Sequence, residues 1–291
     1  MPPFDLVLQL VALGLMTGAG YALLALGLTL VFGIMRLINF AHGEFYMLGA
    51  FATQILCVQL GMPYLAAVPL AALAIGAVGY AISTVVIAPL TRQHETAMLL
   101  ATLGLAYVLM EGTQIALSGE PRIIPTPFAS SIFLIGPIFF TGQQVLTFVL
   151  CLAATGAAAW YVGFTRGGRL MKAVAQNRTG AVVCGINLKA IYNWTFAIGC
   201  GLAALAGATL GASSAIYPSI GQHMVIKIFI VLILGGMGSI PGAVAGGLAL
   251  GLVEALGGGL ISVEYRDAFG YILLVLTLLL RPQGFFAAGI K

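Results

Sequence analysis

Long apolar runs alternate with short polar interruptions along almost the whole chain. A helix needs about 20 predominantly apolar residues to cross the hydrocarbon core of a membrane. Runs that meet or approach this length occupy residues 6–32, 65–88, 98–117, 144–164 and 191–215. Each of them predicts one membrane-spanning helix.

Two further hydrophobic regions are interrupted by polar residues or glycines. Residues 33–45, GIMRLINFAHGEF, contain Arg, Asn, His and Glu and are followed at once by apolar sequence to about residue 59. Residues 217–234 are apolar but short, and residues 235–254, GGMGSIPGAVAGGLALGLVE, begin with glycines and a proline. Such breaks at membrane depth are tolerated only where protein covers them or where they line a wet cavity. Breaks in corresponding positions of two halves indicate the pathway of a transporter.

With a short last run at residues 268–280, the pattern predicts nine crossings, and counts of eight to ten stay open because broken helices are easily miscounted. The predicted fold is an all-α polytopic membrane protein with about eight to nine transmembrane helices in a two-halved arrangement. Residues 1–291 are expected to form a single transmembrane domain. Residues 118–142, which contain four prolines and no helical period, predict an external loop.

Small residues recur at every fourth position in several of the apolar runs. Gly199, Ala203, Gly207 and Gly211 form one such series, and Gly247, Gly251, Ala255 and Gly259 form another. Spacing of this kind lets helix backbones approach closely in lipid. We therefore expect these residues to pack helices rather than to carry chemistry.

Basic residues are concentrated in residues 166–189, RGGRLMKAVAQNRTGAVVCGINLK, which hold five Lys or Arg and no acidic residue. The positive-inside rule places such a short loop on the cytoplasmic side. Nine crossings then put the N-terminus outside and the C-terminus in the cytoplasm, with Arg36 and Arg281 also inside.

The same basic segment has the pattern of two short helices. A helix over residues 168–176 places Arg169, Lys172 and Gln176 on one face and Leu170 and Val174 on another. Turn and cap signals follow at Gly180, Gly185 and Asn187. The pattern alone leaves two interpretations open, a loop that lies on lipid headgroups or a docking element for a cytoplasmic partner.

Composition excludes a soluble protein, because 61% of the residues are hydrophobic and 7% are charged. The net charge of +4 arises largely in the basic segment, so it indicates topology rather than nucleic-acid binding. The four cysteines have no CxxC spacing, and we predict no metal site. The chain also lacks the G-x-x-x-x-G-K-[ST], H-E-x-x-H and G-x-S-x-G motifs, so no catalytic or ATP-binding residues are predicted.

Polar residues within the apolar runs are candidates for a pathway or for helix contacts. Glu44 either pairs, with Arg36 as a candidate partner, or lines a path, whereas Asn39 and His42 suit hydrogen bonds between helices. Lys227 is expected to extend its ammonium toward the membrane surface. The candidate path residues are Asn39, His42, Glu44, Gln222, His223, Gly236, Gly238 and the lone acid Glu254.

Several stretches in this order resemble the permease subunits of branched-chain amino acid (Liv-type) ABC importers. They are residues 28–51, LTLVFGIMRLINFAHGEFYMLGAF, residues 167–187, GGRLMKAVAQNRTGAVVCGIN, residues 234–254, LGGMGSIPGAVAGGLALGLVE, and the terminal LRPQG at residues 280–284. The resemblance covers essentially the whole chain and is closer to the H-type than to the M-type permease.

This resemblance implies a bacterial inner-membrane complex. Its partners would be a second related permease, two cytoplasmic ATPases that bind ATP and Mg²⁺, and a periplasmic solute-binding protein. Residues 173–185 match the loop that couples such permeases to their ATPases, which favours docking over the headgroup interpretation. The implied coupling residues are Arg169, Lys172, Ala173, Gln176, Asn177, Arg178, Ala181, Gly185 and Ile186.

The expected function is inward transport of leucine, isoleucine or valine, or of related small polar solutes, by alternating access driven by the partner ATPases. Permeases for urea, amides or other amino acids are alternatives within the same class. A secondary transporter or channel that works alone is an alternative of another class, and it would need more intramembrane carboxylates than Glu44, Glu111 and Glu254.

Overall fold

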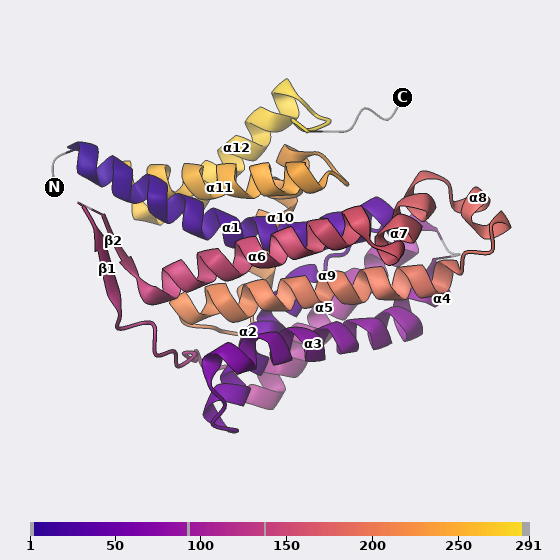
Figure 1. The fold of residues 1–291 in the computed structure, drawn as a ribbon, viewed down its shortest axis with the longest axis horizontal. Coiled ribbons are helices and arrows are strands. Elements are labelled where there is room, and N and C mark those ends of the chain that lie inside the picture. Colours follow the sequence, from indigo (N-terminus) through magenta and orange to yellow (C-terminus); the bar gives the residue numbers. More distant parts are fainter. Residues whose placement is uncertain (1–2, 92–93, 137, 287–291) are drawn as a thin grey trace.

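The chain forms a bundle of long helices with a small hairpin at one end (Figure 1). The computed structural model describes residues 3–91, 94–136 and 138–286, and within these the protein is an all-α polytopic membrane protein, as predicted. Six helices of this part are long and apolar enough to cross a membrane. They are Phe4–Met35, Tyr64–Leu90, Thr96–Leu117, Gly142–Phe164, Leu188–Ser213 and Ile240–Leu260.

Helix α1 (Pro3–Met35) is the central helix of the bundle. It contacts α6 (Gly142–Phe164), α9 (Leu188–Leu210), α10 (Ile220–Gly235) and α11 (Ile240–Leu260). Its middle, residues 18–31, is buried around the whole circumference. Because other parts of the chain cover this stretch on all sides, it packs against protein and not against lipid.

The first predicted break is confirmed at residues 36–41, between α1 and α2 (His42–Val58). Arg36 has a φ of 54°, a backbone conformation that a side chain disfavours, and it ends α1. The ring of His42 lies 3.2 Å from the carbonyl oxygen of Leu24, well before the end of α1. The non-helical residues therefore return into the bundle, and α2 begins inside the protein, where other helices cover the broken backbone.

The span predicted at residues 65–88 consists of α3 (Tyr64–Ile82), a π-helical turn (Ser83–Ile87) and α4 (Ala88–Leu90). The amide of Asn193 in α9 joins the turn to α9, because Ser83 Oγ donates to its oxygen at 2.9 Å and its nitrogen donates to Thr84 Oγ1 at 2.8 Å. Helix α5 (Glu95–Leu117) follows.

The predicted external loop contains a hairpin that the sequence analysis did not anticipate. Strands β1 (Ile132–Ile135) and β2 (Ile138–Thr141) pair in antiparallel fashion, and β2 leads directly into α6. The side chain of Gln9 donates to the Phe139 carbonyl oxygen at 2.8 Å and accepts from the Phe139 N–H at 2.9 Å. The hairpin is thereby tied to the first turns of α1.

The second predicted break is confirmed at residues 236–239, between α10 and α11. Helix α10 has 16 residues, which corresponds to about 24 Å against a hydrocarbon core of about 30 Å. Helix α12 (Arg266–Leu280) completes the described part of the chain after a 3-10 turn (Val263–Tyr265). The six long apolar helices give nine crossings only if the shorter helices α2, α10 and α12 also cross the membrane, so the count of nine stays a prediction.

The spaced small residues lie at close helix contacts. Gly207 of α9 faces the carbonyl oxygen of Tyr46 in α2 so closely that a Cβ atom would overlap it. Gly247 of α11 lies against the backbone of Ala22 in α1, and Gly251, about one turn further along α11, lies against Gly14 and Gly18. Because the backbones approach this closely, α9 packs tightly against α2, and α11 packs tightly against α1.

We expect Gly207→Ala to lower the stability of the purified protein, because the added methyl group must push α2 and α9 apart. The loss should be about 1–3 kcal/mol, the usual cost of overpacking, and would appear as a lower melting temperature in detergent. Gly156→Ala in α6 is the control, since a Cβ atom at Gly156 has no other atom within 4 Å. Equal melting temperatures for the two variants would contradict the close contact.

Candidate coupling segment and intramembrane polar sites

The basic segment forms two short helices, α7 (Arg166–Gln176) and α8 (Arg178–Val183), as predicted. Asn177 separates them and caps α8, because its side-chain oxygen accepts from the Gly180 N–H at 2.8 Å. Gly185 follows α8 with a φ of 78°, and the side chain of Asn187 caps α9 by accepting from the Ala190 N–H at 3.2 Å. The polar residues of this segment thus fix its shape through backbone contacts.

Helix α7 has one buried and one exposed face. Gly168, Met171 and Val174 are buried, whereas Arg169 and Lys172 are exposed. The buried face therefore centres on Met171 and Val174, whereas Leu170, which the sequence pattern puts on the same face as Val174, is 40% exposed. Of the other candidate coupling residues, Ala173 and Ile186 are half-buried and Gln176, Asn177 and Gly185 are exposed.

Helix α8 is attached to the end of α1. The guanidinium of Arg178 donates to the carbonyl oxygen of Met35 at 2.6 Å and lies 5.8 Å from the ring centroid of Tyr192. Ala181 is the buried residue of α8, whereas Val182 and Val183 are 53% and 83% exposed. Two exposed valines next to basic side chains are typical of a surface that another protein covers.

This surface lies at the end of the bundle opposite the hairpin, together with α4 (Figure 1). A cleft of about 630 Å³ lies beside it, between the end of α4 and the start of α9. Arg178, Lys189 and Tyr192 line this cleft together with Pro89 and Thr91. We refer to the exposed residues of α7 and α8 and this cleft as the coupling surface.

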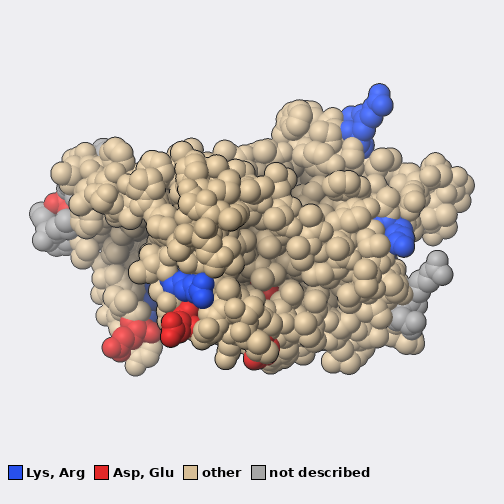
Figure 2. Space-filling view, turned by 90° about the horizontal axis from the view of Figure 1, so that it is seen from below, with Lys and Arg blue, Asp and Glu red and all other residues tan. Residues whose placement is uncertain are grey.

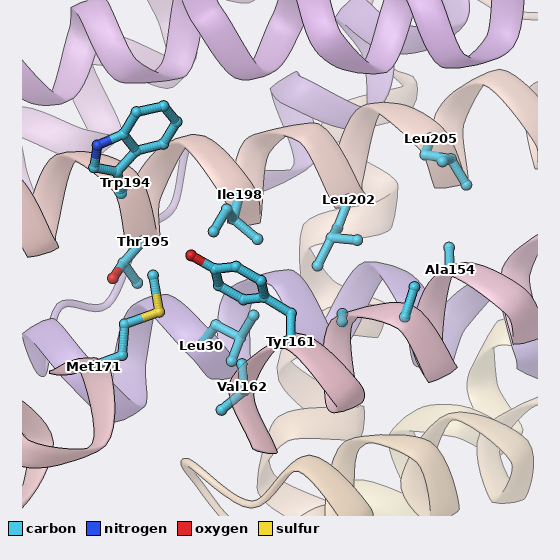
Figure 3. Close-up of a pocket in the computed structure, with 12 residues that line it drawn as sticks. Leu30, Ala154, Tyr161, Val162, Met171, Trp194, Thr195, Ile198, Leu202 and Leu205 are labelled. Atoms are coloured by element: carbon cyan, nitrogen blue, oxygen red, sulfur yellow. The ribbon is translucent and has the colours of Figure 1, made fainter. Parts of the chain in front are cut away.

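An apolar groove of about 540 Å³ lies between α6 and α9 and reaches α7. Figure 3 shows Tyr161 of α6 and Met171 of α7 pointing toward Thr195 and Ile198 of α9. No charged side chain lines the groove among the described residues. It offers little to a polar solute, and it shows instead how α7 is held against the bundle.

The polar residues of the first break are buried but do not meet. Asn39, His42 and Glu44 are at most 1% exposed. His42 contacts α1, whereas the Glu44 carboxylate lies against Gly221 at the start of α10. Each residue keeps one buried side-chain atom without a hydrogen-bond partner in the described part of the chain: Asn39 Nδ2, His42 Nδ1 and Glu44 Oε2. The suggested pair between Glu44 and Arg36 is wrong, because the described residues form no such ion pair and Arg36 is exposed.

Glu254 is not a lone acid, because it lies in a buried cluster of charges. The ammonium of Lys227 in α10 lies 2.9 Å from Glu254 Oε1 in α11 and 2.8 Å from Asp267 Oδ1 in α12. The hydroxyl of Tyr21 in α1 donates to Glu254 Oε2 at 2.8 Å. The expectation that Lys227 reaches the membrane surface is therefore wrong, since its ammonium has partners inside the protein.

Arg266 completes this cluster at a longer distance, with its Nε atom 3.5 Å from Glu254 Oε2. We call Tyr21, Lys227, Glu254, Arg266 and Asp267 the ion cluster. Tyr21, Arg266 and Asp267 were not predicted as members. A lysine in an apolar helix requires an acidic partner, and this rule could have directed attention to the acids of the two following helices.

The remaining path candidates lie apart from the ion cluster. Gln222 and His223 are exposed at the start of α10, with the His223 ring 6.2 Å from that of Tyr217. Gly236 and Gly238 belong to the second break, where Gly238 lies against Gly33 near the end of α1. The two breaks thus adjoin near the end of α1 that carries the coupling surface.

Broken helices buried among spanning helices, with charged groups inside the bundle, define a polytopic membrane transport protein. The profile of the family "Branched-chain amino acid transport system / permease component" matches residues 10–278. The chain belongs to this family.

Curated relatives match over nearly the full length. The chain is 36% identical to the "High-affinity branched-chain amino acid transport system permease protein BraD" of Pseudomonas aeruginosa, over 98% of this chain and 97% of the relative. It is 33% identical to the corresponding LivH protein of Escherichia coli K12, over 93% and 92%. It is 28% identical to a probable LivH of Methanocaldococcus jannaschii, over 90% and 87%. The resemblance to H-type permeases is confirmed, and no solved structure matches the chain significantly.

We expect Lys227→Met to lower the free energy of unfolding in detergent by about 3–5 kcal/mol, because it leaves Glu254 buried without its closest counter-charge. Tyr21→Phe, which removes a hydroxyl that contacts both charges but leaves the ion pair in place, should cost less, about 1.5–3 kcal/mol. The double variant Lys227→Met with Glu254→Gln should be more stable than the sum of the two single losses predicts. Additive losses would contradict a direct ion pair.

Proposed function

We propose that this chain is the permease subunit of an ATP-binding-cassette importer and moves leucine, isoleucine or valine into the cell. The observation that carries the proposal is the full-length similarity to two proteins whose names give a branched-chain amino acid transport system. The complex would lie in a bacterial inner membrane, with a second permease, two ATPases and a periplasmic binding protein as partners.

The proposed orientation has the N-terminus outside and the C-terminus in the cytoplasm. It is supported by the excess of basic residues in α7 and α8, which the positive-inside rule assigns to the cytoplasmic side. The hairpin end then faces the periplasm, where a binding protein would release its solute. Figure 2 shows that charged side chains cover little of the visible face, as a lipid environment requires.

The coupling surface is the proposed docking site for an ATPase subunit. Arg169 and Lys172 supply exposed positive charge, and Val182 and Val183 supply exposed apolar area. Arg178 links this surface to α1 through the Met35 carbonyl oxygen. ATP and Mg²⁺ would be bound by the ATPase subunits, and movement of these subunits would reach the permease through α7 and α8.

The proposed transport cycle is alternating access around the two breaks. Asn39, His42 and Glu44 are path candidates because each has a buried atom without a hydrogen-bond partner among the described residues. Such atoms destabilise a closed protein and favour a state in which water or a polar solute reaches them.

Proteoliposomes that contain this chain with its permease, ATPase and binding-protein partners should accumulate radiolabelled L-leucine. Uptake should require ATP on the ATPase side, because the proposed transport is driven by ATP hydrolysis on the ATPase subunits. The chain itself has no predicted ATP-binding motif. The measurement is the initial rate of uptake with and without ATP. Equal uptake without ATP and without ATPases would contradict the proposal and support a transporter that works alone.

We expect Val183→Asp to weaken the association with the ATPases about tenfold or more, the effect of losing about 1.4 kcal/mol of interface energy. The measurement is co-purification of the ATPase subunits with the permease. Leu60→Asp is the matched control, since Leu60 is also exposed, at 66%, and lies in the turn between α2 and α3. Equal co-purification by both variants would place the docking site elsewhere.

A further inference from the structure

A pocket of about 360 Å³ lies between α1, α6, α10 and α12, on the side of the ion cluster. Its volume is in the range of sites for small molecules, about 300–1,000 Å³. Exposed Ser213 and Ser214, which end and follow the 3-10 turn after α9, line it and open it to the surface. Gln144, which also lines it, belongs to the first turn of α6 beside the hairpin, so the pocket lies toward the hairpin end (Figure 1).

The charged groups of the pocket form a chain of alternating sign. Arg266 lies beside Glu254, Glu254 pairs with Lys227, and Lys227 pairs with Asp267. Lys227, Arg266 and Asp267 line the pocket. The two inner charges neutralise each other within the protein, and the outer two, one positive and one negative, lie on either side of this pair.

The two outer groups have capacity to bind a ligand. The Arg266 guanidinium makes no hydrogen bond to the described residues, and its side chain is 41% exposed. Asp267 uses Oδ1 for Lys227, and its side chain is 50% exposed. A guanidinium recognises a carboxylate through paired N–H donors, and a carboxylate accepts from an ammonium.

The rest of the pocket suits an aliphatic side chain. Met16, Leu210 and Met224 line it, together with the rings of Tyr21 and Tyr46. Methionine side chains are flexible and adapt to differently branched groups. The pocket therefore offers one positive group, one negative group and an adaptable apolar surface.

We propose that this pocket is an amino-acid subsite of the permease, which receives a zwitterionic α-amino acid with an aliphatic side chain on the hairpin side of the bundle. Arg266 binds the α-carboxylate, Asp267 binds the α-ammonium, and Met16, Leu210 and Met224 contact the side chain. The bound zwitterion closes the alternating chain of charges between Arg266 and Asp267. The inference rests on the proposed function, because it gives the imported solute a site on this chain.

The pocket can be tested by protection of a thiol in the complete transport complex. In a Ser214→Cys complex, L-leucine should slow alkylation of the introduced thiol by a maleimide. At a leucine concentration about nine times its dissociation constant the slowing should be about tenfold, because the reagent needs an empty pocket. Peptide mass spectrometry measures the rate. The control is a Leu60→Cys complex, whose introduced thiol lies in the exposed turn between α2 and α3, away from the residues that line the pocket, and whose rate should not change.

Two leucine analogues separate the two charge contacts without any change to the pocket residues. Isopentylamine lacks the carboxylate and 4-methylpentanoate lacks the ammonium, so each should protect about tenfold less well than leucine at equal concentration. Arg266→Gln and Asp267→Asn should each weaken protection by leucine by a similar factor. Arg266→Lys should restore part of it, because the charge is kept and only the paired donors are lost.

The outcomes distinguish the subsite from the proposed function. If the Ser214→Cys complex imports leucine with ATP but leucine gives no protection, the subsite is wrong and the proposed function stands. Equal protection by leucine and both analogues would also overturn the subsite, since charge recognition would then play no part. If leucine protects the thiol but no complex imports it with ATP, the subsite stands and the proposed function fails.

Discussion

The need to keep broken backbone away from lipid is the constraint on which the arrangement depends. Residues 36–41 leave helical geometry and return into the bundle, where α2 starts beside Leu24. No water is present in a bilayer core to satisfy peptide groups, so protein must surround this segment. Close contacts at small residues make this possible, because Gly207 lets α9 approach α2 and Gly247 lets α11 approach α1.

The same need to keep polar groups away from lipid explains the ion cluster, in which buried charges have partners inside the protein. An isolated charge inside a membrane protein is unfavourable, but Lys227 and Glu254 lie 2.9 Å apart and Tyr21 adds a hydrogen bond. Because these residues come from α10, α11 and α1, the cluster also fixes how these helices sit relative to one another. Arg266 and Asp267 of α12 add the groups nearer to the surface, at 41% and 50% exposure. The buried pair of Lys227 and Glu254 therefore holds the more exposed side chains of Arg266 and Asp267 in place through direct contacts.

The sequence predicts which helices and breaks this fold contains better than it predicts how they contact one another in space. Both breaks were predicted, because Asn, His and Glu within an apolar run, or glycines with a proline, are local signals. The two helices of the coupling segment and the cap at Asn187 were predicted for the same reason. The hairpin was missed because its strands are only four residues each, and their apolar residues continue the pattern around them.

The ion cluster could not be placed from the sequence because it depends on distance in space. Lys227 and Glu254 lie in consecutive helices on either side of the second break, and Tyr21 comes from the first helix of the chain. The sequence pattern put Leu170 and Val174 on one face of α7, but the side that the bundle covers centres on Met171 and Val174, because the position of the neighbouring helices decides which part of an apolar face is buried.

Helix α1 physically joins the coupling surface and the ion cluster. It is one uninterrupted helix of 33 residues, and its last carbonyl groups include that of Met35, which accepts from Arg178 of α8. In the middle of the same helix, Tyr21 belongs to the ion cluster and lines the pocket beside it. A movement of α8 that shifts Met35 along the bundle axis must displace Tyr21 as well, unless α1 bends between them. The buried, glycine-packed middle of α1 opposes such bending, because a kink would have to open contacts with α9 and α11 on both sides. Force applied at the proposed docking site would therefore reach the charged pocket through the same packing that keeps the broken backbone covered.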